Sequence, residues 1–92
     1  MSEIKNERVV FNGRVQGVGF RYTVESIAKR HPVKGYVKNL PDGTVELVMQ
    51  GAQTALNGLL KDVTHCFRDN IADCNRIAID YDEEFTHFEI RF

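Results

Sequence analysis

The chain has 92 residues, of which 42% are hydrophobic and 27% are charged, and its formal net charge is −1. This length allows one domain with one hydrophobic core, and no apolar run approaches the roughly 20 residues that a membrane span requires. Residues 1–7 are polar and lack the apolar stretch of a signal peptide. We therefore expect a flexible N-terminal tail at residues 1–7, a folded domain at residues 8–92 and a cytoplasmic location.

Charge is unevenly distributed along the chain. Residues 1–38 contain eight basic and three acidic residues, whereas residues 39–92 contain four basic and ten acidic residues. The near-neutral total argues against general nucleic-acid binding, which draws its affinity from many phosphate contacts. The basic N-terminal part is still suited to a small anionic ligand.

Strand and helix signals alternate in the first third of the chain. Residues 8–12 are rich in β-branched and aromatic side chains and predict a strand, which leads into a glycine-bearing loop at residues 13–19. A helix is predicted to follow, and Pro32 is expected to end it because the residue before a proline avoids the α conformation. The apolar face of this helix consists of Phe20, Val24, Ile27 and Ala28.

Residues 33–39 and 44–50 are predicted to form a β-hairpin. Apolar and polar residues alternate in the second of these segments. The sequence Leu40-Pro41-Asp42-Gly43 between them has turn chemistry, because proline presets φ, aspartate bonds its own backbone and glycine accepts a positive φ. Gly51 is expected to end the second strand.

The rest of the chain predicts a helix and two strands. Thr54 is expected to cap the helix, whose apolar stripe consists of Leu56, Leu59, Leu60, Val63 and Phe67. Residues 69–75 are polar and predict a connection. Alternation then predicts a strand with Ile77, Ile79 and Tyr81 on one face, and a short final strand with Phe88, Ile90 and Phe92.

This order, βαββαβ with a short extra C-terminal strand, predicts an α+β two-layer sandwich of the ferredoxin-like type. The sheet is expected to be mostly antiparallel, with both helices on one face. The opposite face is expected to be more polar. Lys38 and Glu46 suit it, and we expect Tyr36 and Val48 to lie there partly exposed.

The two cysteines, Cys66 and Cys74, belong to no CxxC motif and have no histidine at zinc-ligand spacing. Small secreted domains of this size usually carry more cysteines, arranged as a disulfide framework. We therefore predict that both cysteines are small, partly buried packing residues.

The densest chemical signal is the run Gly13-Arg14-Val15-Gln16-Gly17-Val18-Gly19-Phe20-Arg21. Its three glycines permit backbone angles at which successive N–H groups form an anion-binding nest, and the following helix adds the positive end of its dipole. The guanidinium of Arg21 can donate two parallel hydrogen bonds to phosphate. The run fits neither nucleotide-binding fingerprint, because Phe20 and Tyr22 stand where these need lysine and glycine. It favours a compact phosphate site over the alternative of a loop that only turns the chain.

The run from Gly13 to Arg21 resembles the signature of the acylphosphatase family. The segment Gly35-Tyr36-Val37-Lys38-Asn39 resembles the second signature of that family, and Asp42-Gly43-Thr44-Val45-Glu46 and Gly51 follow it as they do there. The likeness is strong over residues 8–51 and one of pattern alone over residues 52–92. Tyr36 stands where the family often has tryptophan.

The resemblance implies an acylphosphatase, a hydrolase that splits the carboxyl–phosphate bond of small acyl phosphates with no metal or cofactor. Arg21 matches the phosphate-binding arginine of the family, and Asn39 matches the asparagine that orients the attacking water. The phosphate cradle corresponds to the backbone amides of Gln16, Gly17, Val18, Gly19 and Phe20. The implied partners are a small acyl phosphate and inorganic phosphate, with no nucleic acid and no membrane, and we expect a monomer.

Two other interpretations remain open. The first is a non-catalytic phosphate-binding module, since acylphosphatase-like modules also occur inside larger carbamoyl-transfer proteins. The second is an RNA-binding module of the same fold, because Lys34-Gly35-Tyr36 mimics the start of an RNA-recognition motif. Val37 and Lys38 disagree with that motif, which needs a small and an aromatic residue there for base stacking.

Overall fold

The computed structural model describes residues 3–80 and 84–92, so Tyr81 of the predicted strand lies outside the described residues. The described part contains the predicted order of strands and helices. The elements are β1 (Ile4–Gly13), α1 (Phe20–Ala28), β2 (Lys34–Asn39), β3 (Val45–Ala52), α2 (Gln53–Cys66), β4 (Ile71–Ala78) and β5 (Phe88–Arg91).

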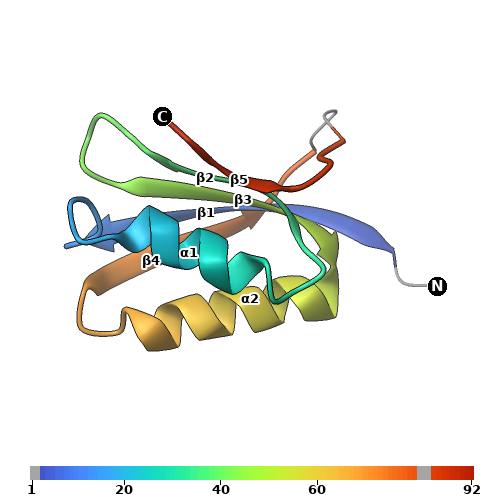
Figure 1. Ribbon diagram of the computed structural model, residues 1–92, viewed down its shortest axis with the longest axis horizontal. Coiled ribbons are helices and arrows are strands. Elements are labelled where there is room, and N and C mark those ends of the chain that lie inside the picture. Colours follow the sequence, from blue (N-terminus) through green and yellow to red (C-terminus); the bar gives the residue numbers. More distant parts are fainter. Residues whose placement is uncertain (1–2, 81–83) are drawn as a thin grey trace.

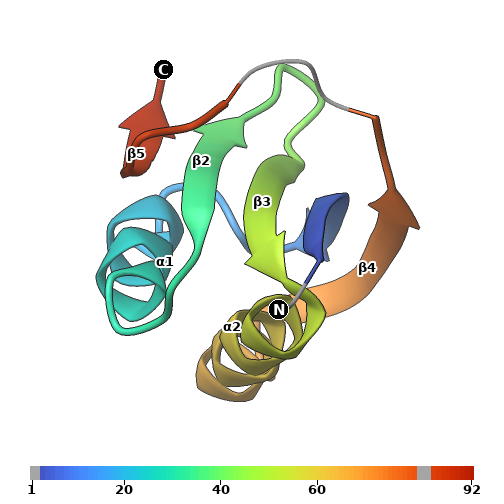
Figure 2. The same cartoon turned by 90° about the vertical axis from the view of Figure 1, so that its right-hand side faces the viewer.

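The strands form one sheet in the order β4-β1-β3-β2-β5. All neighbouring strands are antiparallel except β2 and β5, which are parallel. Both helices cover the same face of the sheet, as Figure 1 and Figure 2 show. The predicted α+β two-layer sandwich with a mostly antiparallel sheet is therefore confirmed. Among the described residues, neither helix has the length and apolar character needed to cross a membrane.

The main hydrophobic core lies between the sheet and the two helices. A group of three aromatic rings in it fixes the beginning of α1. Phe20 is the first residue of that helix. The centre of its ring lies 5.2 Å from the centre of the Phe11 ring in β1 and 4.6 Å from the centre of the Phe67 ring after α2. Such contacts hold a side chain in one orientation, so the core sets the position of the next residue, Arg21.

The opposite face of the sheet carries a second, smaller core. Tyr36 is 8% exposed and Val48 is 1% exposed, and both pack with Phe85 and Ile79. The expectation that Tyr36 and Val48 would be partly exposed is therefore wrong. β4 and β5 lie at opposite edges of the sheet (Figure 2), and Phe85 and Ile79, which come between them in the sequence, pack against Tyr36 and Val48 on this face.

Several predicted boundaries differ from those in the structure. β1 begins at Ile4, so residues 4–7 of the predicted tail belong to the sheet, where they pair with β3. β3 runs through Gly51 to Ala52. β4 begins at Ile71, so most of the predicted connection at residues 69–75 is strand. After Ile71 the side chains of β4 are exposed, and residues 71–75 lack the apolar alternation that predicts a strand.

The predicted cap at Thr54 is wrong. α2 begins at Gln53, its N-cap is Ala52, and no side chain caps it. The two cysteines also differ from the prediction, because Cys66 at the end of α2 and Cys74 in β4 are both exposed and free.

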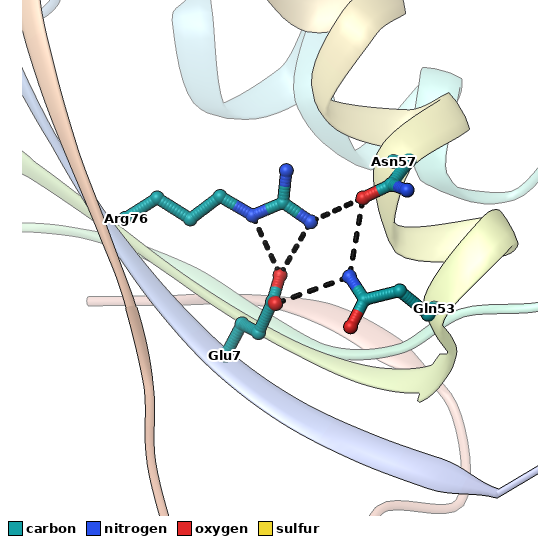
Figure 3. Close-up of polar contacts among 4 residues, drawn as sticks. All are labelled: Glu7, Gln53, Asn57 and Arg76. Atoms are coloured by element: carbon teal, nitrogen blue, oxygen red, sulfur yellow. Dashed lines mark hydrogen bonds and ion pairs between the residues drawn. The ribbon is translucent and has the colours of Figure 1, made fainter.

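A polar cluster joins the beginning of α2 to the sheet (Figure 3). Glu7 of β1, which is 9% exposed, accepts hydrogen bonds from Arg76 of β4 at 2.7 Å and from Gln53 at 3.2 Å. Gln53 and Arg76 also donate to Asn57. A buried carboxylate needs such partners, so this cluster ties β1, β4 and α2 together at the end of the sheet where α2 begins.

Candidate phosphate site

The loop between β1 and α1 has the backbone of an anion-binding nest. Gly17 and Gly19 have φ angles of 76° and 77°, in the left-handed region that glycine tolerates best, and Gly19 is the N-cap of α1. Within the described part of the chain, none of the amides from Gln16 to Phe20 donates to a backbone carbonyl. These amides and the N-terminus of α1 are therefore available to an anion.

The loop is held on both sides. The amide of Arg14 donates to the carbonyl of Asn70 at 2.9 Å, and the side chain of Asn70 donates back to the carbonyl of Arg14 at 3.1 Å. On the other side, Nε2 of Gln16 donates to the carbonyls of Leu40 and Thr44 at 2.9 and 2.8 Å. These bonds fix the loop before a ligand arrives, which favours tight and specific binding.

Arg21 lies in the first turn of α1 and reaches the end of β5. Its guanidinium carbon lies 4.8 Å from the centre of the Phe92 ring, and Nη1 donates a long hydrogen bond of 3.5 Å to the carbonyl of Arg91. None of the ion pairs between described residues involves Arg21. Its positive charge and most of its five N–H donors are therefore free to bind an anion.

The Phe92 ring is expected to strengthen anion binding by holding this guanidinium. A cation–π contact at an exposed site contributes about 0.5–1 kcal/mol, so Phe92→Ala should weaken the binding of inorganic phosphate about two- to fivefold. Phe92→Tyr keeps the ring and should bind phosphate like the wild type. Calorimetric titration measures both affinities, and equal affinities for Phe92→Ala and the wild type would contradict this role.

Asn39 is the last residue of β2 and lies on the same face as Val37, which belongs to the main core. Its Oδ1 atom is buried and has no hydrogen-bond partner among the described residues. Most buried polar atoms in proteins are satisfied, so an orphaned oxygen indicates a water or a ligand. This carboxamide does not stabilise its own turn.

Asp42 stabilises that turn instead. Its Oδ1 accepts hydrogen bonds from the amide of Thr44 at 3.0 Å and from the hydroxyl of Thr44 at 2.6 Å. These bonds hold the pKa of Asp42 below its usual value of 3.8. A carboxylate with a lowered pKa stabilises the fold above that usual value, and the contribution is lost as the pH falls through the lowered pKa.

Removal of this carboxylate should therefore have a pH-dependent effect. We expect Asp42→Ala to lower the melting temperature at neutral pH, and the difference from the wild type to shrink as the pH falls below about 4. Thermal unfolding followed by circular dichroism at a series of pH values measures this difference. A difference that stays constant down to the most acidic pH would show that the carboxylate does not cause it.

The predicted site residues come together at the end of β2. In Figure 1 the loop between β1 and α1, the turn between β2 and β3 and the end of β5 lie at the same end of the sheet. Gln16 bonds to Leu40, which follows Asn39, and Arg21 bonds to Arg91, which pairs with Lys38. These contacts bring the loop with the cradle amides, and α1 with Arg21, to the end of β2 that carries Asn39.

Sequence reasoning did not find two of these contacts, the Gln16 side chain on the hairpin and the Phe92 ring on Arg21. No sequence spacing signals either, because each depends on how the strands are ordered. Among the residues that the structure describes, no group of three or more histidine, cysteine, aspartate or glutamate side chains could hold a metal ion.

A ferredoxin-like sandwich with a glycine-bearing anion loop beside a free arginine defines a small protein with a candidate phosphate site. The sequence model of the acylphosphatase family matches residues 7–90. An acylphosphatase of Gloeobacter violaceus is 36% identical over 90 residues, which is 98% of this chain and 97% of that protein. The chain belongs to the acylphosphatase family, which confirms the predicted family.

Other relatives match over a shorter stretch. The acylphosphatase of Bacillus licheniformis is 46% identical over 56 residues, which is 61% of this chain and 62% of that protein. The crystal structure of the acylphosphatase from Bacillus subtilis has a TM-score of 0.84 and 30% identity, and the likeness covers 98% of this chain and all of that one. Full-length HypF has a TM-score of 0.85 at 23% identity over 12% of its own chain, which shows a shared fold.

Proposed function

We propose that this protein hydrolyses the carboxyl–phosphate bond of small acyl phosphates to a carboxylate and inorganic phosphate. The observation that carries the proposal is the buried Oδ1 of Asn39, which has no partner among the described residues and lies on a strand end whose next residue, Leu40, is bound by Gln16 of the anion-binding loop. A loop that only bound phosphate would not need a second, unsatisfied polar atom next to it. The acylphosphatase relatives support the same reaction.

The phosphoryl group is held by the amides of residues 16–20 and by Arg21. Phosphoryl transfer passes through a loose transition state, in which negative charge is spread over the oxygens around phosphorus. Fixed amide dipoles and a guanidinium stabilise that charge without reorganisation during the reaction. The Phe92 ring and the Arg91 carbonyl, which hold Arg21, keep this group in place.

The attacking water is oriented by Asn39. Its Oδ1 accepts a hydrogen bond from the water and so directs an oxygen lone pair at phosphorus. A carboxamide has no proton that ionises at neutral pH, so Asn39 is not a general base, and an oxygen of the substrate phosphate takes the proton of the water. The bond from phosphorus to the acyl oxygen breaks, and the carboxylate leaves with the electron pair. Because a carboxylate is weakly basic, this step needs no general acid.

We propose that the reaction proceeds in a cytoplasmic monomer without a metal ion. Positioning and electrostatic stabilisation are sufficient for so good a leaving group. The groups assigned to the reaction bind the phosphoryl group and orient the water, so they do not select among small acyl groups.

The proposal is tested by following the hydrolysis of benzoyl phosphate and acetyl phosphate with purified protein in excess chelator. We expect enzymatic turnover well above spontaneous hydrolysis, with competitive inhibition by inorganic phosphate. Phosphate binding without turnover would favour the non-catalytic module instead. RNA binding that strengthens as the salt concentration falls, together with no turnover, would favour the RNA-binding module.

A further inference from the structure

We infer that the Gln16 side chain is a positioning residue, which sets the distance between the phosphate cradle and the water that Asn39 orients. The inference rests on the proposed hydrolysis, because it assigns a role within that reaction. It concerns the carboxamide of Gln16, whereas the cradle uses the backbone amide of the same residue.

The carboxamide of Gln16 binds the hairpin at two points. Nε2 donates to the carbonyl of Leu40 at 2.9 Å and to the carbonyl of Thr44 at 2.8 Å, which occupies both of its protons. These carbonyls lie at the two ends of the turn, which is closed by a hydrogen bond of 2.9 Å from the Leu40 amide to the Thr44 carbonyl. Gln16 therefore binds a turn that is already rigid.

The two carbonyls flank Asn39 and its partner. Leu40 directly follows Asn39, and Thr44 directly precedes Val45, which pairs with Asn39 across the hairpin. A shift of Leu40 therefore moves Asn39 through the peptide bond between them. A shift of Thr44 moves Asn39 through Val45, its partner in the hairpin. One residue thus joins the first amide of the cradle to the strand end that carries the water-orienting group.

Among the described residues, the hydrogen bonds that join residues 16–20 to the hairpin are those of the Gln16 side chain. Gly17, Val18 and Gly19 are exposed, and the bonds of Arg14 to Asn70 hold the loop on its far side. Val15 and Phe20, on either side of residues 16–19, are anchored in the core, so loss of the Gln16 side chain lets the exposed residues between them shift relative to the hairpin. The reaction is sensitive to such a shift, because a misplacement of about 1 Å can reduce the rate about 10²-fold.

Gln16→Met tests this role, since methionine has nearly the same shape but no donor. We expect kcat for benzoyl phosphate to fall about 10- to 100-fold and the Kd of inorganic phosphate to change less than about threefold. The backbone amides and Arg21 still bind phosphate in this variant, but the water is no longer in line. This separation of kcat from phosphate affinity is what a purely structural role would not produce.

Gln53→Met is the matched control. Its Nε2 also donates two hydrogen bonds, to Glu7 at 3.2 Å and to Asn57 at 3.1 Å, but at the opposite end of the sheet, where α2 begins (Figure 1). The same chemical change there should leave kcat within about twofold of the wild type, since no site contact is lost. Any general effect of losing two such bonds appears in both variants.

The outcomes separate the inference from the proposed function. A wild-type protein without turnover overturns the proposed function. An active wild type in which Gln16→Met keeps its kcat, or loses phosphate affinity as much as kcat, overturns the inference. If Gln16→Met does not fold, scalar couplings through hydrogen bonds in the wild type decide, because the couplings from Nε2 of Gln16 to the Leu40 and Thr44 carbonyl carbons must be present. Their absence overturns the inference as well.

Discussion

Arg21→Ala is expected to lower kcat/KM for benzoyl phosphate about 10²–10³-fold, the usual effect of removing one positioned donor from a charged transition state. Among the described residues, the guanidinium of Arg21 forms no ion pair; it has a cation–π contact with the Phe92 ring and a hydrogen bond to the Arg91 carbonyl. Its charge is therefore not neutralised by the protein and is available to the phosphoryl group. Inorganic phosphate should also bind more weakly, since the same donors hold substrate and product.

Arg21→Lys should recover only a small part of this loss. Lysine keeps the charge, but it lacks the planar pair of donors that binds two phosphate oxygens at once. Arg30→Ala is the control, because Arg30 is exposed beyond the far end of α1 and its removal changes the net charge equally. Steady-state kinetics at constant ionic strength measure all three variants. Equal losses in Arg21→Ala and Arg30→Ala would mean that only long-range charge matters, and would contradict the assigned role.

The strands and helices with a regular row of buried apolar side chains were the easiest to predict from the sequence. Val45, Leu47 and Met49 occupy every second position in β3, and all three are fully buried. Apolar residues at every second position are typical of a strand, so the hairpin could be recognised without knowledge of its neighbours. The same holds for the helical stripe of α2.

The parts that depend on distant segments were not predictable. β4 is an edge strand with exposed side chains, so Ile71 to Asn75 show no alternation, and only pairing with β1 makes them a strand. From the sequence, Tyr36 and Val48 were expected to lie partly exposed on the sheet face opposite the helices. They are buried because Phe85, which is 37 or more residues away in the chain, packs against them.

The residues of the candidate site could also be predicted from the sequence, whereas the contacts between them could not. The glycine positions and Arg21 could be found because the loop concentrates them in nine residues, and the role of Asn39 came from a resemblance. The contacts between these groups could not be found, since Gln16 reaches Leu40 across 24 residues and Arg21 reaches Arg91 across 70. A sequence shows which groups are suited to phosphate, whereas their common location follows from the fold.

The separation of binding from turnover should be sharpest at Asn39. We expect Asn39→Ala to lower kcat at least about 10²-fold, because the attacking water loses the acceptor that aligns it with phosphorus. The Kd of inorganic phosphate should change less than about threefold, since the cradle amides and Arg21 are intact. Phosphate affinity from calorimetry and kcat from benzoyl phosphate hydrolysis give the two quantities.

Asn39→Ala should also be at least as stable as the wild type. A buried polar atom without a partner destabilises a protein by about 1–3 kcal/mol, and the Oδ1 atom of Asn39 has no protein partner among the described residues. Asn12→Ala, at an exposed position in β1, controls for the substitution itself and should keep normal turnover. Normal turnover in Asn39→Ala would contradict the assigned role, and so would a loss of kcat matched by an equal loss of phosphate affinity.

Asn39→Asp tests whether the side chain at position 39 faces the bound phosphate. Aspartate has nearly the same shape and keeps an oxygen that can accept a hydrogen bond from water, but it places a negative charge beside the phosphate. That charge should weaken phosphate binding, which the alanine variant retains, and the effect should diminish at low pH as the carboxylate is protonated. If the carboxamide oxygen faces the bound phosphate group, only the aspartate variant will show this pH-dependent loss of affinity; equal phosphate affinities in the two variants at neutral pH would place Asn39 away from the phosphate.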